Sequence, residues 1–538
     1  MKYLKMSYLI AAITSLLLSF PVIAASTQGT DDIKTLHRGN STEPATLDPH
    51  QSEDVSSGNI LRDLFEGLVS EDAAGNIIPG AAQKWTISED GRTYTFTLRN
   101  CLAWSNGEAL TAADFMFSLQ RVLDPQTAAP MASLLQPIEN AREVLTGNKP
   151  VEALGIQMPD SHTLVIRLQQ PTPWFLQLLA QPVAFPVYAT SLVKHDDKAF
   201  STGKLVSNGA WKLQQWVPYE KLVLARNTKY YNHGQSFFDQ VIYYPIDSSN
   251  TEFSRYRAGE LDWTDTIPPN KLRWINKNLP GEAFISPYLG TYYYGFNLTR
   301  PPFNASADLR RALSLAIDRN IIVEKILGNG EMAADQWLPP ALFPAHEKSK
   351  NIDRHTTESM NKRLLLAKEL YRKAGYSKDR PLQTTLHYNT SEQNKRIAVA
   401  IAAMWKQHLG VKVELINEEW KVFLNRRKGK TDTQLYRASW IADYNDAGSF
   451  LDLFTSNHAK NDTGYANQYY DKLVEQIAST SDNKQRDSLI RQAERQLLDD
   501  QVIIPVYHYV SRHLVKPDIK GYLANPLDHH YSRDLYKE

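Results

Sequence analysis

The sequence predicts a mixed α/β protein with more than one domain, and three observations support this prediction. Segments with the apolar alternation of β-strands are interleaved along the chain with segments that gather apolar residues on one helical face. The chain has 538 residues, more than one hydrophobic core usually serves. It contains no low-complexity tract, internal repeat or long linker. We therefore expect domains that are joined by strand crossings, an arrangement suited to hinge motion.

The strand predictions depend on period-two alternation. Apolar residues alternate with polar neighbours at Tyr94, Phe96 and Leu98, and again at Leu164, Ile166 and Leu168. This is the pattern of half-buried strands.

Three helices are indicated by their ends and by their apolar faces. Thr111 is followed three residues later by Asp114, the spacing of a capping box that opens a helix. Two further apolar faces consist of Leu309, Ala312, Leu313, Ala316 and Ile317, and of Ile397, Ile401, Met404, Trp405 and Leu409. The second of these helices is expected to stop at Gly410.

The N-terminus has the features of a cleavable secretory signal. Lys2 and Lys5 precede an apolar run over residues 9–23, and Val22-Ile23-Ala24 offers the small residues of a cleavage site. We expect residues 1–24 to be removed. The alternative, an uncleaved anchor, needs a longer apolar run of about 20 residues. Since Ala25 rather than cysteine would follow the cut, we expect a protein without a lipid anchor in the periplasm of a Gram-negative bacterium.

Composition and motifs argue against several functions. The formal charge of +1, with interspersed acids and bases, does not favour nucleic acid as a partner. The single cysteine, Cys101, allows no internal disulfide and no thiolate metal cluster. There is no phosphate-binding loop, no nucleophile elbow and no His-Glu-x-x-His motif, so we expect a protein that is not an enzyme and needs no cofactor. For Asp528-His529-His530 we favour a solvated or hydrogen-bonded structural role over a metal role.

A series of short motifs makes the chain recognisable. It comprises Ala82-Gln-Lys-Trp85, Ser88-Glu-Asp-Gly91, Tyr94-Thr-Phe-Thr-Leu-Arg99, Trp104-Ser-Asn-Gly107, Leu110-Thr-Ala-Ala-Asp-Phe115, Asn208-Gly-Ala-Trp211, Arg255-Tyr-Arg-Ala-Gly-Glu260, Pro301-Pro-Phe-Asn304 and Asp318-Arg319. In this order the motifs resemble those of the large solute-binding proteins of peptide, dipeptide and nickel ABC importers. Asp63-Leu-Phe-Glu-Gly67, Tyr292-Tyr-Tyr294, Tyr388-Asn-Thr-Ser391 and Ala442-Asp-Tyr-Asn445 are most similar to the oligopeptide-binding and murein-peptide-binding branch.

The resemblance implies a three-domain α/β fold of the large periplasmic-binding-protein type (type II, cluster C), with two lobes that close on a ligand by hinge motion. Domain I would consist of residues 25–65, 191–289 and 508–538. Domain II would be an insertion over 66–190, and domain III would cover 290–507.

The resemblance also implies a set of binding residues. Asp443 matches an aspartate that pairs with the ligand α-amino group, and a free ammonium in a closed cleft needs such an anionic partner. The alternative for Asp443 is a turn aspartate. Glu53 and Val55 match a segment that pairs with the peptide backbone. The remaining matches are Arg437 and Arg427 as cleft arginines, Trp420 as an aromatic wall, and Tyr293, Asn389, Asn394 and Trp440 as lining residues.

Alternatives remain for two of these residue types. Each arginine could instead pair with an internal acid such as Glu53. Tyr293 could belong to the core of a strand.

The chain departs from the oligopeptide-binding pattern at several positions. Asn394 stands where that branch has a carboxylate-contacting histidine, Met131 where it has a tyrosine and Leu327 where it has a lysine. Gly290 and Ile441 replace its disulfide pair. Loss of two potential cations favours a ligand of different length, a modified peptide such as a murein fragment, or an amphiphile.

We therefore predict a solute-binding protein that delivers short peptides to an inner-membrane ABC permease with a cytoplasmic ATPase, and that is a monomer. Two alternatives remain. The first keeps the fold but binds a non-peptide solute such as a bile salt, a sugar-peptide or a metal complex. The second is a periplasmic chaperone or sensor partner.

Overall fold

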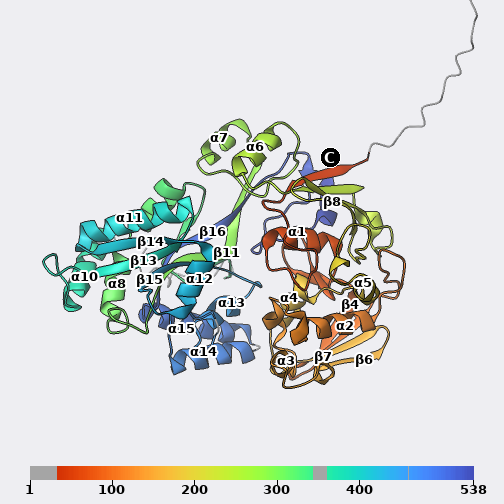
Figure 1. Cartoon of the computed structure of the whole chain (residues 1–538), viewed down its shortest axis with the longest axis horizontal. Coiled ribbons are helices and arrows are strands. Elements are labelled where there is room, and N and C mark those ends of the chain that lie inside the picture. Colours follow the sequence, from red (N-terminus) through yellow and green to blue (C-terminus); the bar gives the residue numbers. More distant parts are fainter. Residues whose placement is uncertain (1–32, 343–359, 459, 481) are drawn as a thin grey trace, which may run out of the picture. The chain divides into compact units, whose positions relative to one another are not determined.

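The computed structural model describes residues 33–342, 360–458, 460–480 and 482–538. The predicted signal segment, residues 1–24, lies outside the described residues. Residues Lys34–Glu538 form one unit in which strands and helices are interleaved (Figure 1). The predicted α/β class is confirmed. In the described part of the chain, no helix combines the length and apolar character needed to cross a bilayer.

A first four-stranded sheet joins distant parts of the sequence. Its strand order is β1-β10-β9-β8, and β1 is parallel to β10 while the other pairs are antiparallel. The strands are β1 (Thr35–Gly39), β8 (Trp211–Val217), β9 (Lys221–Arg226) and β10 (Gln240–Tyr244). The same segments supply the helices α1 (Val55–Leu64), α6 (Ser249–Arg257) and α7 (Leu272–Asn278). Near the C-terminus, β17 (Ile519–Lys520) pairs with β18 (Tyr536–Lys537).

A second four-stranded sheet lies within residues 66–190. Its antiparallel order is β4-β5-β7-β6, with β4 (Ala82–Ile87), β5 (Thr93–Leu98), β6 (Ile156–Asp160) and β7 (Thr163–Arg167). The alternating residues predicted to be apolar strand faces are all buried in its core. This segment also contains β2 (Val69–Glu71), β3 (Ile77–Pro79), α2 (Ala112–Leu123), α3 (Ala141–Leu145) and α4 (Phe175–Leu179), and α5 (Ala189–His195) runs across its end.

The predicted helix start at Thr111 is confirmed. The carboxylate of Asp114 accepts hydrogen bonds from the backbone N–H of Thr111 at 2.8 Å and from its hydroxyl at 3.1 Å. These bonds fix the first turn of α2, whose apolar face then packs on the second sheet.

A six-stranded sheet in the order β12-β16-β11-β15-β13-β14 dominates the rest of the chain. Its strands are β11 (Ala283–Phe296), β12 (Met332–Ala333), β13 (Gln383–Asn389), β14 (Lys412–Glu418), β15 (Leu435–Ile441) and β16 (Ile503–Leu514). Its helices are α8 (Ala307–Leu315), α9 (Arg319–Ile321), a π-helical turn (Ile322–Leu327), α10 (Met360–Lys373), α11 (Glu392–Leu409), α12 (Trp420–Gly429), α13 (Gly448–Leu451), α14 (Gln468–Ser479) and α15 (Asn483–Asp499).

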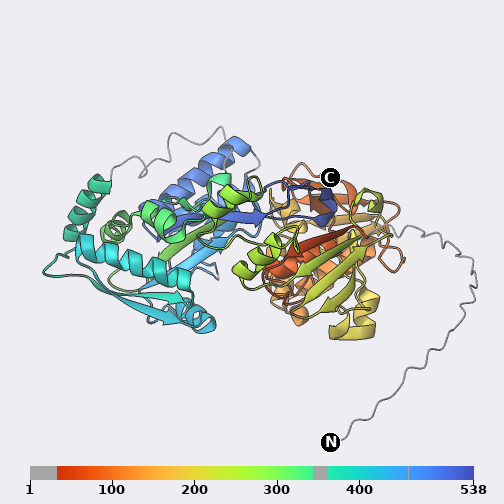
Figure 2. The same ribbon diagram turned by 90° about the horizontal axis from the view of Figure 1, so that it is seen from above.

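Helices cover both faces of this sheet (Figures 1 and 2). Successive residues of β11 alternate between two cores, because side chains on a strand point to opposite faces. Tyr292 and Tyr294 enter the core with α8, α10 and α11, whereas Tyr293 enters the core with α13, α14 and α15. The predicted stop of α11 is confirmed by the left-handed conformation of Gly410, at φ 77°.

Two long antiparallel strands link the six-stranded sheet to the first sheet. β11 and β16 pair from Gly295 opposite Ile503 to Ala283 opposite Leu514. Beyond that end, an isolated bridge joins Val515 to Trp263, which in turn bridges to Arg38 of β1. The three-domain boundaries at 65, 190, 289 and 507 remain a prediction, and β11 and β16 run across the last two of them.

Candidate functional site

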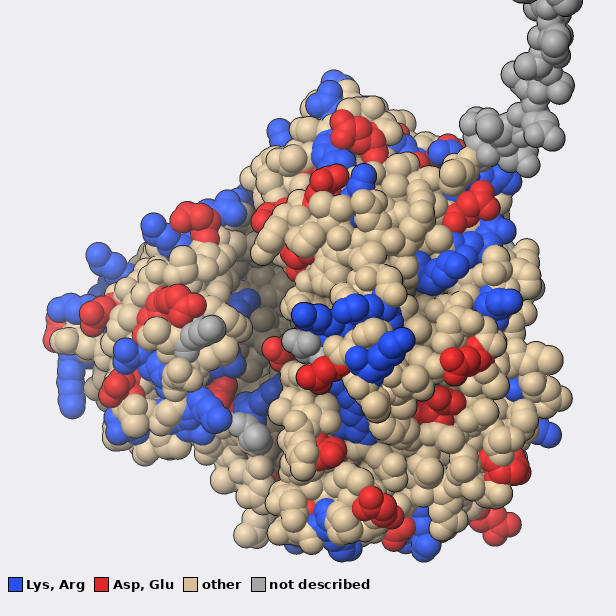
Figure 3. All heavy atoms as spheres, turned by 45° about the vertical axis from the view of Figure 1, so that its right-hand side comes forward, with Lys and Arg blue, Asp and Glu red and all other residues tan. Residues whose placement is uncertain are grey.

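A cavity of about 380 Å³ is lined by residues from five separate parts of the chain. They come from the N-terminal segment with the end of β1 and α1, from the second-sheet segment, from residues 263–288, from the end of β15 and the loop after it, and from the C-terminal region with the end of β16 and the tail. Three sequence-predicted site residues meet there, namely Asp443, Glu53 and Val55. The molecular surface is deeply hollowed on the face drawn in Figure 3, with charges of both signs around the hollow. A cavity of this volume lies within the usual range for small-ligand sites.

Asp443 brings an uncompensated carboxylate to this cavity. It follows β15, and its backbone N–H is held by the hydroxyl of Ser449 at 3.1 Å. Within the described part of the chain, no residue donates a hydrogen bond to its carboxylate or forms an ion pair with it. Burial raises the pKa of Asp443, and only the charge of Lys460 acts in the opposite direction. A half-buried carboxylate without a partner is well placed to receive a cation.

Glu53 and Val55 contribute exposed groups to the same cavity. Glu53 lies in the loop that ends at Asp54, whose carboxylate caps α1 by accepting from the N–H of Ser57 at 2.8 Å. Both Glu53 and Val55 are exposed and line the cavity. Among the described residues, Glu53 has no backbone hydrogen-bond partner. Its N–H and carbonyl are thus free to pair with an extended ligand.

The C-terminal tail forms another wall of the cavity, where charges are paired. Nη2 of Arg62 lies 2.6 Å from Nε2 of His529, and Nδ1 of His529 lies 2.8 Å from Oε2 of the buried Glu71. Burial, followed by the charge of Arg62, lowers the pKa of His529. The neutral imidazole therefore donates to Glu71 and accepts from Arg62, which connects cation and anion through one ring.

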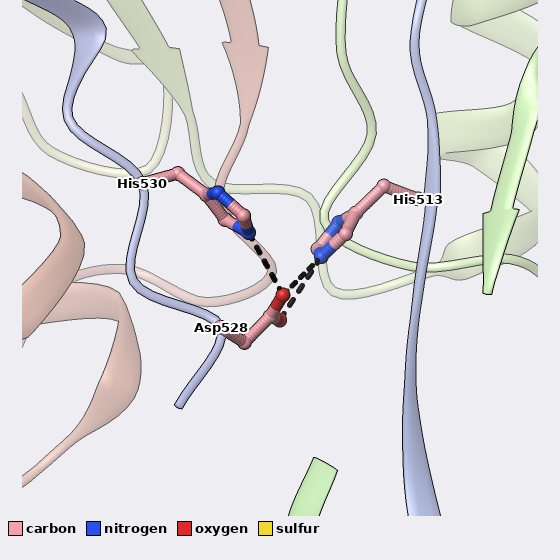
Figure 4. Close-up of side chains that lie close together, drawn as sticks. All are labelled: His513, Asp528 and His530. Atoms are coloured by element: carbon pink, nitrogen blue, oxygen red, sulfur yellow. Dashed lines mark hydrogen bonds and ion pairs between the residues drawn. The ribbon is translucent and has the colours of Figure 1, made fainter. Parts of the chain in front are cut away.

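Next to Arg62, His529 and Glu71 lies a cluster of His513, Asp528 and His530 (Figure 4). Both imidazoles direct Nε2 at the Asp528 carboxylate, each at 2.9 Å. Of the two structural roles favoured for Asp528-His529-His530, the hydrogen-bonded one applies, since His530 is only 7% exposed. In the described part of the chain, this is the one group of three or more His, Cys, Asp or Glu side chains whose ligand atoms all lie within 4.8 Å of one another.

Arg437 belongs to a second cluster, which does not line this cavity. Its guanidinium lies over the ring of Tyr292, 4.8 Å from the centroid, and its nitrogens reach Oδ1 of Asn389 and the hydroxyl of Tyr509 only at 3.4 Å. No described acid forms an ion pair with it. Asn394 lies beside it and donates to Oδ1 of Asn389 at 3.0 Å. The structure therefore brings Arg437, Asn389 and Asn394 together.

Arg427 and Tyr293 occupy the other face of the six-stranded sheet. Nε of Arg427 lies 2.6 Å from Oδ2 of Asp462, with both side chains largely buried, so this arginine is paired with an internal acid. Tyr293 is 6% exposed and packs its edge on Trp337 at 5.0 Å between centroids, in the core position that was the alternative to a lining role.

The two predicted tryptophans lie apart from the cavity lining. Trp420 begins α12, is 46% exposed and stacks on Phe423. Trp440 is half-buried under the ammonium of Lys460, 5.1 Å from the ring centroid, and its buried indole N–H has no partner among the described residues.

The positions that depart from the oligopeptide-binding pattern behave differently from one another. Met131 lines the cavity, whereas Leu327 is 3% exposed and packs in the core with α8, α10 and α11. Gly290 and Ile441 lie directly opposite one another on β11 and β15. A Cβ on Gly290 would come within 2.5 Å of Cδ1 of Ile441, so the isoleucine side chain fills the space in front of the glycine.

Sequence reasoning did not place several titratable residues in the cavity, namely Arg38, Arg62, Asp265, His513, Asp528 and His530. They are contributed by segments more than 200 residues apart, and none carries a local pattern that distinguishes it from a surface charge. The available signal was the Asp528-His529-His530 tract, which we interpreted as structural.

Comparisons with known proteins extend over nearly the whole chain. The profile of the bacterial extracellular solute-binding proteins, family 5, middle region, matches residues 76–462. The chain is 41% identical over 508 residues to the periplasmic oligopeptide-binding protein of Escherichia coli, covering 94% of this chain and 92% of that protein. It is 38% identical over 530 residues to the probable deoxycholate-binding periplasmic protein of Escherichia coli, covering 97% and 98%.

A solved structure agrees with these sequence relationships. The Escherichia coli murein tripeptide binding protein superimposes with a TM-score of 0.81 at 38% identity, covering 94% of this chain and 99% of that one. A profile that matches most of the chain, relatives that align over more than nine-tenths of their length and a shared fold lead to one conclusion: this chain belongs to family 5 of the bacterial extracellular solute-binding proteins.

Proposed function

We propose that this chain is the periplasmic binding component of an ABC importer and that it captures short peptides by their α-amino group and backbone. The observation that carries the proposal is the carboxylate of Asp443, which lines the cavity without a partner among the described residues while burial raises its pKa. Family membership, and relatives that are named for peptide binding, support the same function.

The chemistry of the cavity suits the parts that all peptides share. A peptide ammonium would neutralise Asp443 in a charge-assisted hydrogen bond. The unpaired backbone of Glu53 would add main-chain hydrogen bonds without reading the peptide sequence. Outside the cavity lining, Arg437 is the candidate for a ligand carboxylate, because its guanidinium has no ion pair with a described acid, whereas Arg427 is paired with Asp462.

In this proposal the protein is a carrier, not a catalyst. Residues 1–24 direct export and are removed, and the mature protein acts as a monomer. Ligand contacts made to more than one lobe would stabilise a closed form by hinge motion. The loaded protein would deliver its peptide to an inner-membrane permease, and a cytoplasmic ATPase would supply the energy.

Deoxycholate and murein fragments are the competing solutes. The relationship to a probable deoxycholate-binding protein favours the first of them. Deoxycholate has a carboxylate and no amine, so it would leave Asp443 unpaired, and this is why we favour peptides.

The test starts with native mass spectrometry of protein purified without refolding, which gives the mass of any retained solute. Calorimetry then measures tri-, tetra- and penta-alanine, their N-acetylated forms and deoxycholate on wild type and on Asp443→Asn. Asp432→Asn is the control, since it removes the same charge from a side chain that is 69% exposed.

If the ammonium binds Asp443, the Asp443→Asn substitution weakens the free peptides by about 30-fold or more, the equivalent of about 2 kcal/mol. N-acetylation of the peptides should weaken their binding to wild type by a similar factor. It should change their binding to Asp443→Asn little, because each change removes the same ion pair. A loss below about twofold in Asp443→Asn would reject the role of this residue. If the purified protein retains deoxycholate and binds none of the peptides, deoxycholate replaces the peptide as the proposed solute.

A further inference from the structure

The tail of the chain and β16 bring three potential metal ligands to one point. Nε2 of His513, which lies near the end of β16, is 2.9 Å from each carboxylate oxygen of Asp528. Nε2 of His530 approaches Oδ1 of the same carboxylate at 2.9 Å. All three donor atoms lie within 4.8 Å of one another (Figure 4).

The donor set has the composition of a transition-metal site. Two imidazole nitrogens and one carboxylate oxygen suit Zn²⁺, Ni²⁺ or Cu²⁺, with metal–ligand distances of about 2.0–2.2 Å. An ion at the convergence point of Figure 4 would lie between atoms that now interact directly. Small side-chain rotations would open the 2.9 Å contacts to the spacing of ligands around one ion.

The surrounding residues hold both rings in orientations that suit this role. Nδ1 of His513 lies 2.9 Å from the carbonyl oxygen of Thr264 and accepts from the indole N–H of Trp263 at 3.1 Å, and these contacts hold the ring with Nε2 toward Asp528. The ring of His530 packs against Trp263 and Tyr522, at 4.9 and 4.8 Å between centroids. Contacts with neighbouring groups therefore fix the orientation of both rings.

The cluster also opens onto the cavity. His513, Asp528 and His530 all line it, as does the half-buried Asp265, whose carboxylate favours a cation there when it is ionised. Arg38 lines the same wall and opposes a cation, although its guanidinium is directed at Ser532 Oγ, at 2.8 Å, and at the carbonyl of His530. Three protein ligands beside a cavity leave coordination positions for water or for donor atoms of a bound solute.

We propose that His513, Asp528 and His530 bind one divalent first-row transition-metal ion in the wall of the cavity. The proposal does not depend on the identity of the transported solute, because the three ligands belong to the protein itself.

The test uses full-length mature protein without a histidine tag, stripped of metal with a chelator. Zn²⁺ alone is titrated by competition with a chromophoric chelator, and Cu²⁺ alone is followed by electron paramagnetic resonance. We expect one ion per chain and a Cu²⁺ spectrum with coupling to two imidazole nitrogens. His530→Ala and Asp528→Asn should each weaken Zn²⁺ binding by about tenfold or more, since loss of even a residue that hydrogen-bonds to a metal ligand lowers metal affinity that much.

His162→Ala is the control, because His162 is an exposed histidine outside the cluster, and it should bind Zn²⁺ as wild type does. Circular dichroism of each metal-free variant separates loss of a ligand from loss of the fold. Wild type alone still decides the question if the variants unfold. Absence of one-site Zn²⁺ binding, a Cu²⁺ spectrum without two nitrogens, or wild-type affinity in both cluster variants would overturn the proposal.

Discussion

Two walls of the same cavity differ in whether their charged side chains are paired. On the wall after β15, Asp443 has a carboxylate without a described partner and a raised pKa. On the wall built from α1 and the tail, Arg62, His529 and Glu71 form a closed chain of contacts at 2.6 and 2.8 Å. An unpaired charge near low-dielectric surroundings is costly and gains by binding a ligand, whereas charges that already contact one another gain less. The difference separates a residue that would receive a solute from residues that hold a wall in place.

The largest expected effect comes from breaking the paired wall. Glu71→Ala removes the carboxylate that contacts His529 and leaves Arg62 and His529 without an anion. The free energy of unfolding should therefore fall by about 3–5 kcal/mol. Urea unfolding of the solute-free protein measures this. Asp443→Ala is the contrasting variant and should cost less than about 1 kcal/mol, because it breaks no pair. Equal losses in the two variants would show that the walls do not differ.

The two arginines allow the same comparison within the six-stranded sheet. Arg427→Gln should lower the free energy of unfolding by about 3 kcal/mol, because it leaves Asp462 buried without its partner. Arg437→Gln should have little effect on stability but should weaken the binding of peptides with a free C-terminal carboxylate by about tenfold. C-terminally amidated peptides should bind Arg437→Gln and wild type alike. A strong stability loss in Arg437→Gln, with unchanged peptide affinity, would assign it a structural role.

The smallest effect is the pH dependence that Asp443 gives to the solute-free protein. Because burial raises its pKa in the folded state above the ordinary value of 3.8, the folded state binds more protons than the unfolded state between those two values. The stabilising contribution is present below pH 3.8 and is lost as pH rises through the folded-state pKa.

Urea unfolding of wild type and Asp443→Asn from pH 3.5 to 7, at constant ionic strength, checks this sign. The difference in unfolding free energy, wild type minus variant, should decrease with rising pH and then level off. The exposed Asp432→Asn variant is the control. A difference that increases with pH would mean that Asp443 has a cationic partner in the solute-free protein.

The sequence predicted the parts of the fold that depend on local periodicity. Tyr94, Phe96 and Leu98 are buried on β5, the carboxylate of Asp114 opens α2, and Gly410 ends α11. These features need only neighbours along the chain.

The candidate site was predicted less completely. Asp443, Glu53 and Val55 meet at one cavity, while Arg437, Asn389 and Asn394 form a separate cluster and Tyr293 lies in a core.

By itself, then, the sequence determined the α/β class, the helix and strand faces, and the motifs that indicate the family. Only the tertiary structure decided which charges are paired. It joined Arg427 to Asp462, left Arg437 without an ion pair to a described acid, and brought His513 of β16 against Asp528 and His530 of the tail. The physical reason is that an ion pair depends on the distance between two side chains, and here that distance is set by strand register and by the return of the tail to the cavity.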